Sequence, residues 1–356
     1  MQDYGPFGDP QMHYASRGRQ TPPVLTPEEK LLKRKLGREV KSAVRRACRV
    51  WGQTVRDSLR TETALYLVRN EAAKETVRVD VVDGVPPHLR PYLHGVNEED
   101  WEFVLKRWLL RFTSDGLKFV DDRYDYVRKM LWEQREPASK CEVERVKKLI
   151  DDILAKMHGA DLVHRILREH SDVLGAYFFN ESRIEMYWMV IGLVARSEGI
   201  DLDGLTVTVL CHELAHAYTH LGFDTASGQW NTKAFADADL SIVEGLAQFY
   251  TGAVAERVRP RSPSVEKAFK ALLRLQEGPY LAHLGWSEKD ENAGEAVRHA
   301  MVETRSQELI HHSEFLKSLD AARKEVGRRH KAPKKPPAKP DPDFDPEPEA
   351  EDESDA

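Results

Sequence analysis

The chain contains the stretch LTVTVLCHELAHAYTHL at positions 205–221, and this stretch decides how the rest is interpreted. Apolar residues recur through it at helical spacing, which predicts a mostly buried helix. These residues are Leu205, Val209, Leu210, Leu214 and Leu221. His212 and His216 are four positions apart, so their rings lie on the same face of that helix, one turn from each other. Polar side chains in so apolar a helix need partners, because burying them unsatisfied costs several kcal/mol.

A metal ion would satisfy these side chains. Two imidazoles one turn apart can bind the same ion. Glu213 is rotated by about 100° from His212, so it can lie beside the ion and take a proton from its water instead of binding it. The alternative is a pair of ordinary buried histidines bonded to carboxylates. Cys211 points away and is expected to be a small buried hydrophobe. His220 lies about 12 Å along the axis from His212, too far to bind the same ion, and is expected near the ligands or on the surface.

A third protein ligand would leave one position free for water. Glu244 is the candidate, because it is an isolated carboxylate in a second apolar helix, DLSIVEGLAQFY at positions 239–250. The small residues Gly245 and Ala247 beside it permit close helix crossing. A salt bridge on the helix face is the alternative role for Glu244. Asp237 and Asp239 are weaker candidates, because N-capping near the helix start explains them better.

Together the two segments resemble the gluzincin group of zinc metallopeptidases, to which thermolysin-like enzymes belong. The resemblance is carried by His212-Glu213-Leu214-Ala215-His216 and Glu244-Gly245-Leu246-Ala247. It implies one Zn²⁺ ion bound by His212, His216 and Glu244, with Glu213 as the general base. It extends from Gly175 to Gly252, with Trp286 as the alternative end, and the N-terminal third has no counterpart.

The chain departs from the family pattern in two places. The gap between the second histidine and Glu244 is longer than in thermolysin, and the acid expected one turn after the third ligand is Gln248. A glutamine can still accept a hydrogen bond from a ligand histidine, though it orients the ring less strongly than a carboxylate. The related metzincin pattern would require a histidine at position 222, which is Gly222.

Catalysis of this kind also needs a donor for the developing oxyanion. In gluzincins a tyrosine or histidine after the third ligand often has this role. Tyr280 is the first candidate and His283 the second, both in the Gly- and Pro-marked segment EGPYLAHLGW at positions 277–286. The alternative for Tyr280 is a packed loop aromatic. Arg305 is a weaker candidate for substrate binding.

The fold class expected from these patterns is α+β, predominantly helical, with a zincin-like core at 159–330. Alternating apolar residues predict a small hairpin from Gly175–Asn180 and Arg183–Trp188, followed by a helix from about Met189. By the same resemblance, one hairpin strand would hold an extended substrate. A further short strand is predicted at Thr76–Val82.

Residues 27–158 are expected to form a helical region that begins with a basic helix, either a separate domain or the first lobe of one enzyme. Thr26 is a candidate cap for a helix over Pro27–Arg60, in which eleven residues from Lys30 onward are Lys or Arg. That helix could contact nucleic acid, or it could simply be solvated with its apolar face inward; the predicted inward residues are Leu32, Val40, Val44 and Val50. Asn97 is expected to cap a helix containing Trp101, Val104, Leu105, Trp108 and Leu109. Two more helices are expected at Asp121–Gln134 and Ser139–His158.

Composition sets the remaining expectations. Of 356 residues 41% are hydrophobic, enough for a core, and no uncharged apolar run could span a membrane. The ends, 1–26 and 331–356, are rich in Pro or charge and are expected to be disordered. The net charge of −6 arises from nine acids in 341–356, without which the chain carries +3. Three cysteines argue against a disulfide framework. With no signal peptide visible, a soluble cytoplasmic protein is expected.

The function expected from the sequence is zinc-dependent hydrolysis of peptide or protein substrates. One alternative is an inactive zincin-fold binding protein that contacts a partner or nucleic acid through its basic helix, although nucleic acid is the less favoured partner. Another is a zinc amidohydrolase acting on a non-peptide amide. The oligomeric state is left open.

Overall fold

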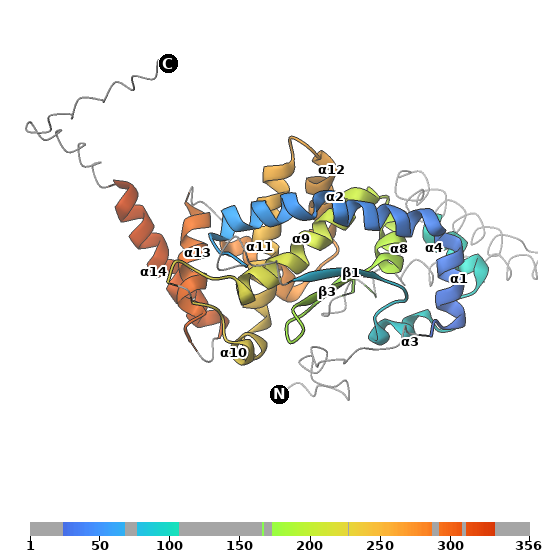
Figure 1. Cartoon of the computed structure of the whole chain (residues 1–356), viewed down its shortest axis with the longest axis horizontal. Helices are drawn as coiled ribbons and strands as arrows, with labels where there is room; N and C mark the ends of the chain where they lie inside the picture. The colour runs from blue at the N-terminus through green and yellow to red at the C-terminus, as the bar shows by residue number, and fades with distance from the viewer. Residues whose placement is uncertain are drawn as a thin grey trace, which may run out of the picture.

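Helix α9, formed by the stretch at 205–221, lies at the centre of the computed structural model (Figure 1). The structure describes residues 24–67, 77–106, 166, 173–226, 228–286, 292–307 and 311–331. The helices expected at Asp121–Gln134 and Ser139–His158 lie outside these ranges, as do nearly all residues of the two termini. The described helices of the N-terminal part are α1 (Pro27–Leu36), α2 (Arg38–Thr63), η2 (Pro87–Leu89), α3 (Arg90–Leu93) and α4 (Glu98–Lys106). Those that follow are α8 (Trp188–Glu198), α9 (Leu202–Leu221), α10 (Thr232–Asp237), α11 (Leu240–Val258), α12 (Pro263–Leu273), η3 (Gly278–Trp286), α13 (Ala293–Thr304) and α14 (His312–Lys331).

The basic N-terminal helix is two helices. Thr26 caps α1 as expected, in a reciprocal capping box with Glu29. The chain then turns at Gly37, whose φ of +83° is a conformation that suits glycine, and α2 begins at the next residue. The prediction of a single helix over Pro27–Arg60 was therefore wrong, because the helix is interrupted at Gly37.

The apolar face of these helices is buried as predicted, except at one residue. Leu32, Val40 and Val44 are in the core, whereas Val50 is 61% exposed. The buried stripe of α2 passes instead through Ala47 and Val55, three and eleven positions after Val44, and Val50 lies off this stripe.

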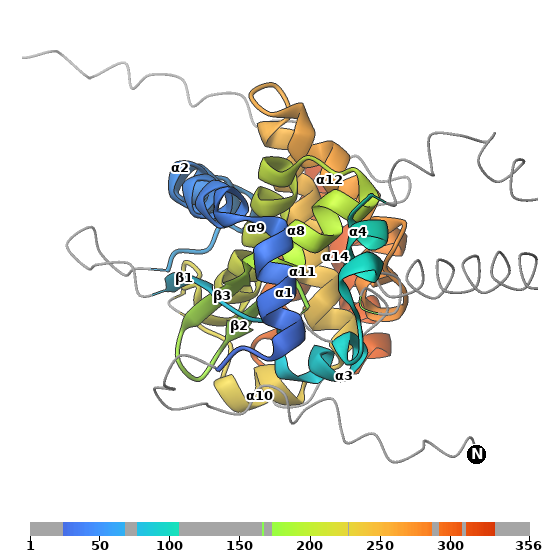
Figure 2. The ribbon, with the colours of Figure 1, turned by 90° about the vertical axis from the view of Figure 1, so that its right-hand side faces the viewer.

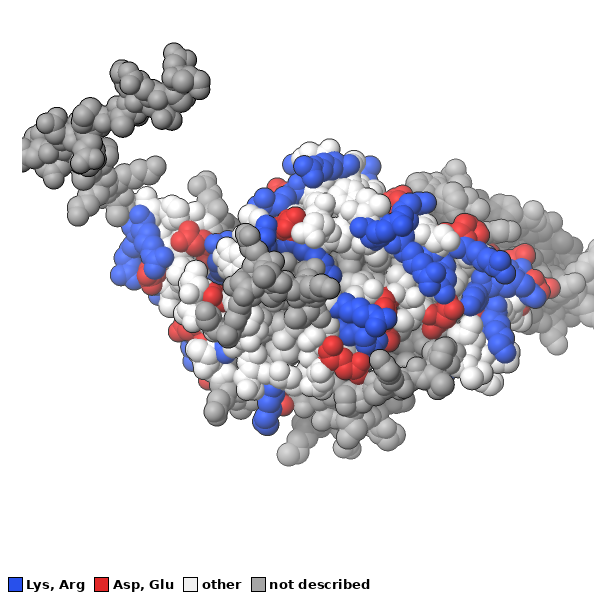
Figure 3. Space-filling model, viewed as in Figure 1, with Lys and Arg blue, Asp and Glu red and all other residues white. Residues whose placement is uncertain are grey.

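Basic residues on α1 and the start of α2 pair with acids from other elements. Lys33 and Lys41 both bond Asp83, at 3.0 and 2.6 Å, and Lys35 bonds Glu98 and Glu102. Figure 3 shows blue and red side chains next to each other over this part of the surface. Part of the positive charge is therefore neutralised within the fold.

The sheet has three strands, in the order β1 (Arg78–Val82), β3 (Arg183–Tyr187), β2 (Gly175–Phe178). The predicted hairpin is confirmed, since β2 pairs antiparallel with β3, with Ala176 opposite Glu185. The predicted strand from the N-terminal region is also confirmed, and it pairs parallel with β3. Figure 2 shows the sheet on one side of the helices, with β2 and β3 in contact with α9. Among the described strands, β2 has one open edge.

The protein is therefore predominantly helical with one small sheet, as the sequence predicted. Helix α9 is buried nearly all round because α2, α11 and α12 pack along it. The predicted helix from Met189 is confirmed as α8. Asn97 caps α4 as predicted by accepting from the backbone N–H groups of Glu99 and Asp100, and Trp101, Val104 and Leu105 are buried. Buried residues from both the N-terminal and the later elements join in one hydrophobic core.

None of the described helices is both long enough and apolar enough to cross a membrane.

Candidate metal centre

Two capped, buried helices bring the predicted ligands together. Asp201 starts α9 by accepting from the N–H of Gly204 at 2.7 Å, and Asp239 starts α11 by accepting from the N–H of Ser241 at 2.8 Å. Asp239 is thus a helix cap, as expected. Asp237 ends α10 and pairs with Lys233. Because α9 and α11 pack against each other, the histidines of one helix face the glutamate of the other.

The three predicted ligand atoms converge closely. His212 Nε2 lies 3.1 Å from Glu244 Oε2 and 3.2 Å from His216 Nε2, and the third side, His216 Nε2 to Glu244 Oε2, is 3.6 Å. The side chains of Glu244 and His216 are buried, whereas that of His212 is 11% exposed. The triangle therefore reaches solvent on the side of His212.

This triangle fits a metal ion. Ligand atoms at bonds of about 2.0–2.1 Å in a tetrahedral site lie about 3.3 Å apart, which falls within the three observed spacings. Two imidazole nitrogens and a carboxylate oxygen that face each other in a buried site are all electron-rich, so a cation satisfies them together. Within the described ranges, these three residues form a buried group that could hold a metal ion.

The pKa shifts of His212 and Glu244 both favour metal binding. Burial lowers the pKa of His212, which keeps its ring neutral, against the smaller opposing effect of Glu244. Burial alone would raise the pKa of Glu244, but the two adjacent histidines outweigh it and hold that pKa well below its usual value. Neutral imidazoles and an ionised carboxylate are the forms that bind metals.

Glu213 directly follows His212 on α9, and its side chain lies against strand β2. Its side chain is buried, and a Cβ built on Gly175 would come within 2.8 Å of Glu213 Cγ and Oε1. The absence of a side chain at Gly175 therefore lets the strand and the carboxylate approach. Sequence reasoning did not identify this role of Gly175, because the role follows only from the packing of β2 against α9.

The segment that carries Tyr280 and His283 is a 3₁₀ helix, η3, not the loop that its Gly and Pro residues suggested. The ring of Tyr280 lies 5.9 Å from that of His212, measured between centroids. His283 Nδ1 lies 3.0 Å from the backbone oxygen of Tyr280, and burial lowers the pKa of His283 to about 4. Both residues are buried, and the Tyr280 ring lies beside that of His212, one of the candidate ligands.

Gly245 brings η3 this close. A Cβ at this position would meet Trp286 of η3 at 2.5 Å, so only glycine allows the present packing. The expectation that small residues next to Glu244 permit close crossing is thus confirmed for Gly245, with a 3₁₀ helix as the neighbour.

Gln248 does not have the partner that the family pattern suggests. Its amide nitrogen donates to Gln276 Oε1 at 2.9 Å. Among the described residues His212 Nδ1 has no hydrogen-bond partner, so none of them orients this ring through that atom.

Three further sequence candidates lie apart from the metal triangle. His220 is buried, not on the surface, and lies 3.0 Å from the Tyr177 hydroxyl and 3.1 Å from Thr232 Oγ1. Arg305 is also buried and donates to the backbone oxygens of Gly222 and Gly228, so it fastens the loop after α9 and does not line the site. Cys211 is buried as expected, and burial raises its pKa to about 12.

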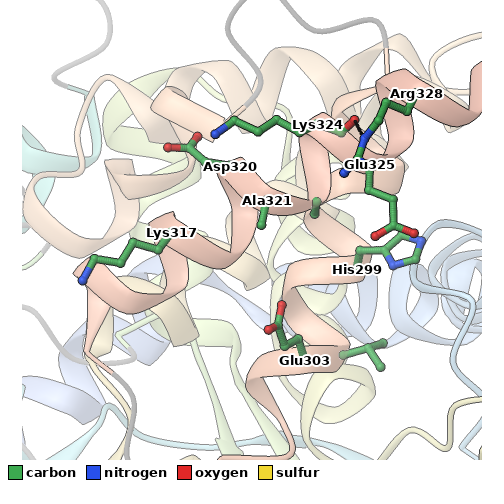
Figure 4. Close-up of a pocket in the computed structure, with 10 residues that line it drawn as sticks. His299, Glu303, Lys317, Asp320, Ala321, Lys324, Glu325 and Arg328 are labelled. Carbon is green, nitrogen blue, oxygen red and sulfur yellow. Dashed lines mark hydrogen bonds between the residues drawn. The ribbon is translucent and has the colours of Figure 1, made fainter. Parts of the chain in front are cut away.

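A much wider hollow than the one at the candidate metal centre lies elsewhere in the described part of the chain. A groove of about 740 Å³ lies between α13 and α14 and is lined by side chains of both charges, among them Lys317 and Asp320 (Figure 4). It includes none of the three metal-binding candidates. A cavity of only about 30 Å³ does reach the metal centre, at His216. Its other walls come from β2 and the residue after it, from α10 and from the start of α11, and α10 was not predicted from the sequence.

The geometry of the chain itself carries these assignments. No protein-family model, curated protein or solved structure matches this chain.

Proposed function

We propose that this protein is a zinc-dependent metallopeptidase of the gluzincin type. The observation that carries the proposal is the triangle of His212 Nε2, His216 Nε2 and Glu244 Oε2, with sides of 3.1–3.6 Å. Two imidazoles and one carboxylate are a typical ligand set of catalytic zinc, which keeps a fourth position for water or substrate. The partial exposure of His212 agrees with an open position on that side.

The proposed chemistry divides between the ion and the chain. Zinc, when bound, lowers the pKa of a water molecule toward neutrality and polarises a carbonyl group. Glu213 accepts the proton of the attacking water on a carboxylate oxygen and then donates it to the leaving amine. Its place directly after His212, on the same turn of α9, supports this role.

The open edge of β2 supports a peptide substrate. Tyr187 N–H donates to the backbone oxygen of Leu174, and antiparallel pairing alternates. Ala176 and Phe178 therefore bond β3, whereas Gly175 and Tyr177, both buried, direct their backbone groups to the edge with which no described strand pairs. An extended peptide can pair there as an added strand, next to Glu213.

Tyr280 is the proposed donor for the oxyanion, with His283 second. The closeness of the Tyr280 ring to His212 supports this order. His283 is proposed to hold the turn of η3 through its contact with the Tyr280 carbonyl.

The test compares the wild type with Glu213→Gln, in metal content and in cleavage of a peptide library. We expect one zinc per chain in both proteins, with cleavage only by the wild type. The matched control is Glu256→Gln, which removes the same charge from an exposed position on α11.

The alternatives give different results. A zincin-fold binding protein would hold zinc and cleave no peptide even as the wild type. An amidohydrolase would cleave small amides in preference to peptides. Unchanged peptide cleavage by Glu213→Gln would refute the role of Glu213.

A further inference from the structure

The cavity of about 30 Å³ beside the candidate metal centre is lined mainly by apolar and aromatic residues. Its walls contain no Asp, Glu, Lys or Arg, and His216 contributes its imidazole to them. The lining residues are Tyr177, Phe179, His216, Phe235, Ala236, Ala238, Leu240 and Val243. Because His216 is both a proposed zinc ligand and part of this wall, the cavity lies directly alongside the metal centre.

The far wall of the cavity is held rigidly. The His220 ring stacks on Phe235 with centroids 4.6 Å apart, and Phe179 meets both rings edge-on at 6.0–6.2 Å. Tyr177 joins this cluster through its hydroxyl, which is occupied by His220 Nδ1. The hydroxyl is thus engaged, and the face presented to the cavity is apolar.

The cavity has an accessible side. Six of its eight lining residues are buried, whereas Ala236 and Leu240 are partly exposed. These two residues lie at the end of α10 and the start of α11, and they are the two lining residues that reach solvent.

Strand β2 relates the cavity to the proposed reaction centre. Gly175 lies against Glu213, and two residues later Tyr177 lines the cavity, on the same face of the strand. A peptide paired with β2 and cleaved next to Glu213 would therefore place a side chain at the cavity within about two residues of the scissile bond, since strand residues rise about 3.3 Å each.

From this arrangement we propose that the cavity is a specificity pocket for a small apolar side chain, alanine to valine in size, close to the cleaved bond. The inference rests on the proposed peptidase function and deepens it. A volume of about 30 Å³ holds roughly two water-sized groups, which suits one to three methyl groups and excludes an aromatic ring. A lining without carboxylates or lysines gives a charged side chain no partner.

The test measures kcat/KM for peptides that carry Gly, Ala, Val, Leu, Phe or Asp at each of the two positions on either side of the cleaved bond. At one position we expect Ala or Val to exceed Gly, Phe and Asp by about tenfold, which is what one or two buried methyl groups contribute. Val243→Ala should enlarge the cavity and admit Leu, and Ala236→Leu should fill it and shift the preference to Gly. Val254→Ala is the matched control, since Val254 is buried on the same helix and does not line the cavity.

Two outcomes separate this inference from the function on which it rests. In the first, peptides are cleaved with the same selectivity by the wild type, Val243→Ala and Ala236→Leu. That result would refute the proposed specificity pocket and leave the proposed peptidase function intact. If no peptide is cleaved, the peptidase is wrong, and the pocket is judged by binding of the same peptides to zinc-loaded protein carrying Glu213→Gln. The proposed pocket is supported if binding depends on side-chain size and both pocket substitutions shift this preference. It is overturned if all the peptides bind with equal affinity.

Discussion

Gly175 of β2 lies so close to Glu213 of α9 that a methyl group on the glycine would come within 2.8 Å of the carboxylate. The contact joins the edge strand to the proposed general base across 38 positions of sequence. The contact therefore fixes the distance between the strand along which a peptide would bind and the carboxylate that would move the proton.

Gly175→Ala is therefore expected to displace the Glu213 carboxylate. The obstructing atoms belong to a side chain that can rotate, so the free energy of unfolding should change little while kcat falls at least tenfold, because proton transfer depends on position. Steady-state kinetics and zinc analysis check this, with zinc content unchanged. Gly285→Ala is the control, since its Cβ would meet nothing within 4 Å. An unaltered kcat for Gly175→Ala would show that the added methyl group does not displace the Glu213 carboxylate.

Gly245→Ala addresses the packing between α11 and η3. The new Cβ would lie 2.5 Å from Trp286, a ring held within the core, so overpacking should lower the free energy of unfolding by about 1–3 kcal/mol. Urea denaturation measures this. In Gly294→Ala, also a helical glycine but with open space around it, the helix preference of alanine should stabilise by up to about 1 kcal/mol. Equal effects at the two positions would contradict the close packing.

The candidate metal ligands were predictable because their signal is local. His212 and His216 are four apart on one helix, and a lone acid in an apolar helix, Glu244, suggested the third ligand. The structure brings the three together as that pattern requires. Local signals also predicted the Thr26 cap, the hairpin and helix α8, since caps and periodicity depend on neighbouring residues.

Contacts distant in sequence were not predictable in this way. Nothing local to Gly175 or Gly245 says which side chain will approach it, and the alternation of β1 does not reveal that it pairs with β3. Gly37 was missed for a different reason: one glycine inside a helical pattern is often tolerated, and only its positive φ marks the break. Arg305 resembled a substrate-binding group because its charge was visible and its carbonyl partners were not.

Zinc is expected to stabilise the protein through the proposed ligands. At a free concentration 100 times Kd, binding adds about 2.7 kcal/mol, which raises Tm by roughly 4 °C in a chain of 356 residues. The rise should disappear in His216→Ala and remain in His299→Ala, which removes an exposed histidine. Differential scanning calorimetry with and without zinc measures it. An equal rise in both variants would move the binding site elsewhere.

Tyr280→Phe tests the proposed oxyanion donor. Loss of one such donor lowers kcat by about 10²–10³ while the zinc content stays at one per chain. Tyr218→Phe is the matched control, because its hydroxyl bonds the backbone oxygen of Arg56 and the same atom is removed. Kinetics in which both variants retain the wild-type kcat would leave Tyr280 a packing residue.

His220 should make stability depend on pH. Burial, with a smaller effect of Arg305, lowers its folded pKa to about 4, whereas an unfolded histidine has a pKa near 6.5. The unfolded chain therefore binds the proton first, so the stability contributed by neutral His220 is complete above about pH 6.5 and is lost as the pH falls toward 4. The shift corresponds to about 3 kcal/mol. His220→Phe keeps an aromatic ring against Phe235 but lacks the titrating group and both hydrogen bonds. Urea denaturation of zinc-free protein measures the difference in free energy of unfolding between wild type and variant. This difference should be largest at pH 7 and smaller by about 3 kcal/mol at pH 4. A difference that does not change with pH would show that His220 binds its proton equally in the folded and unfolded states.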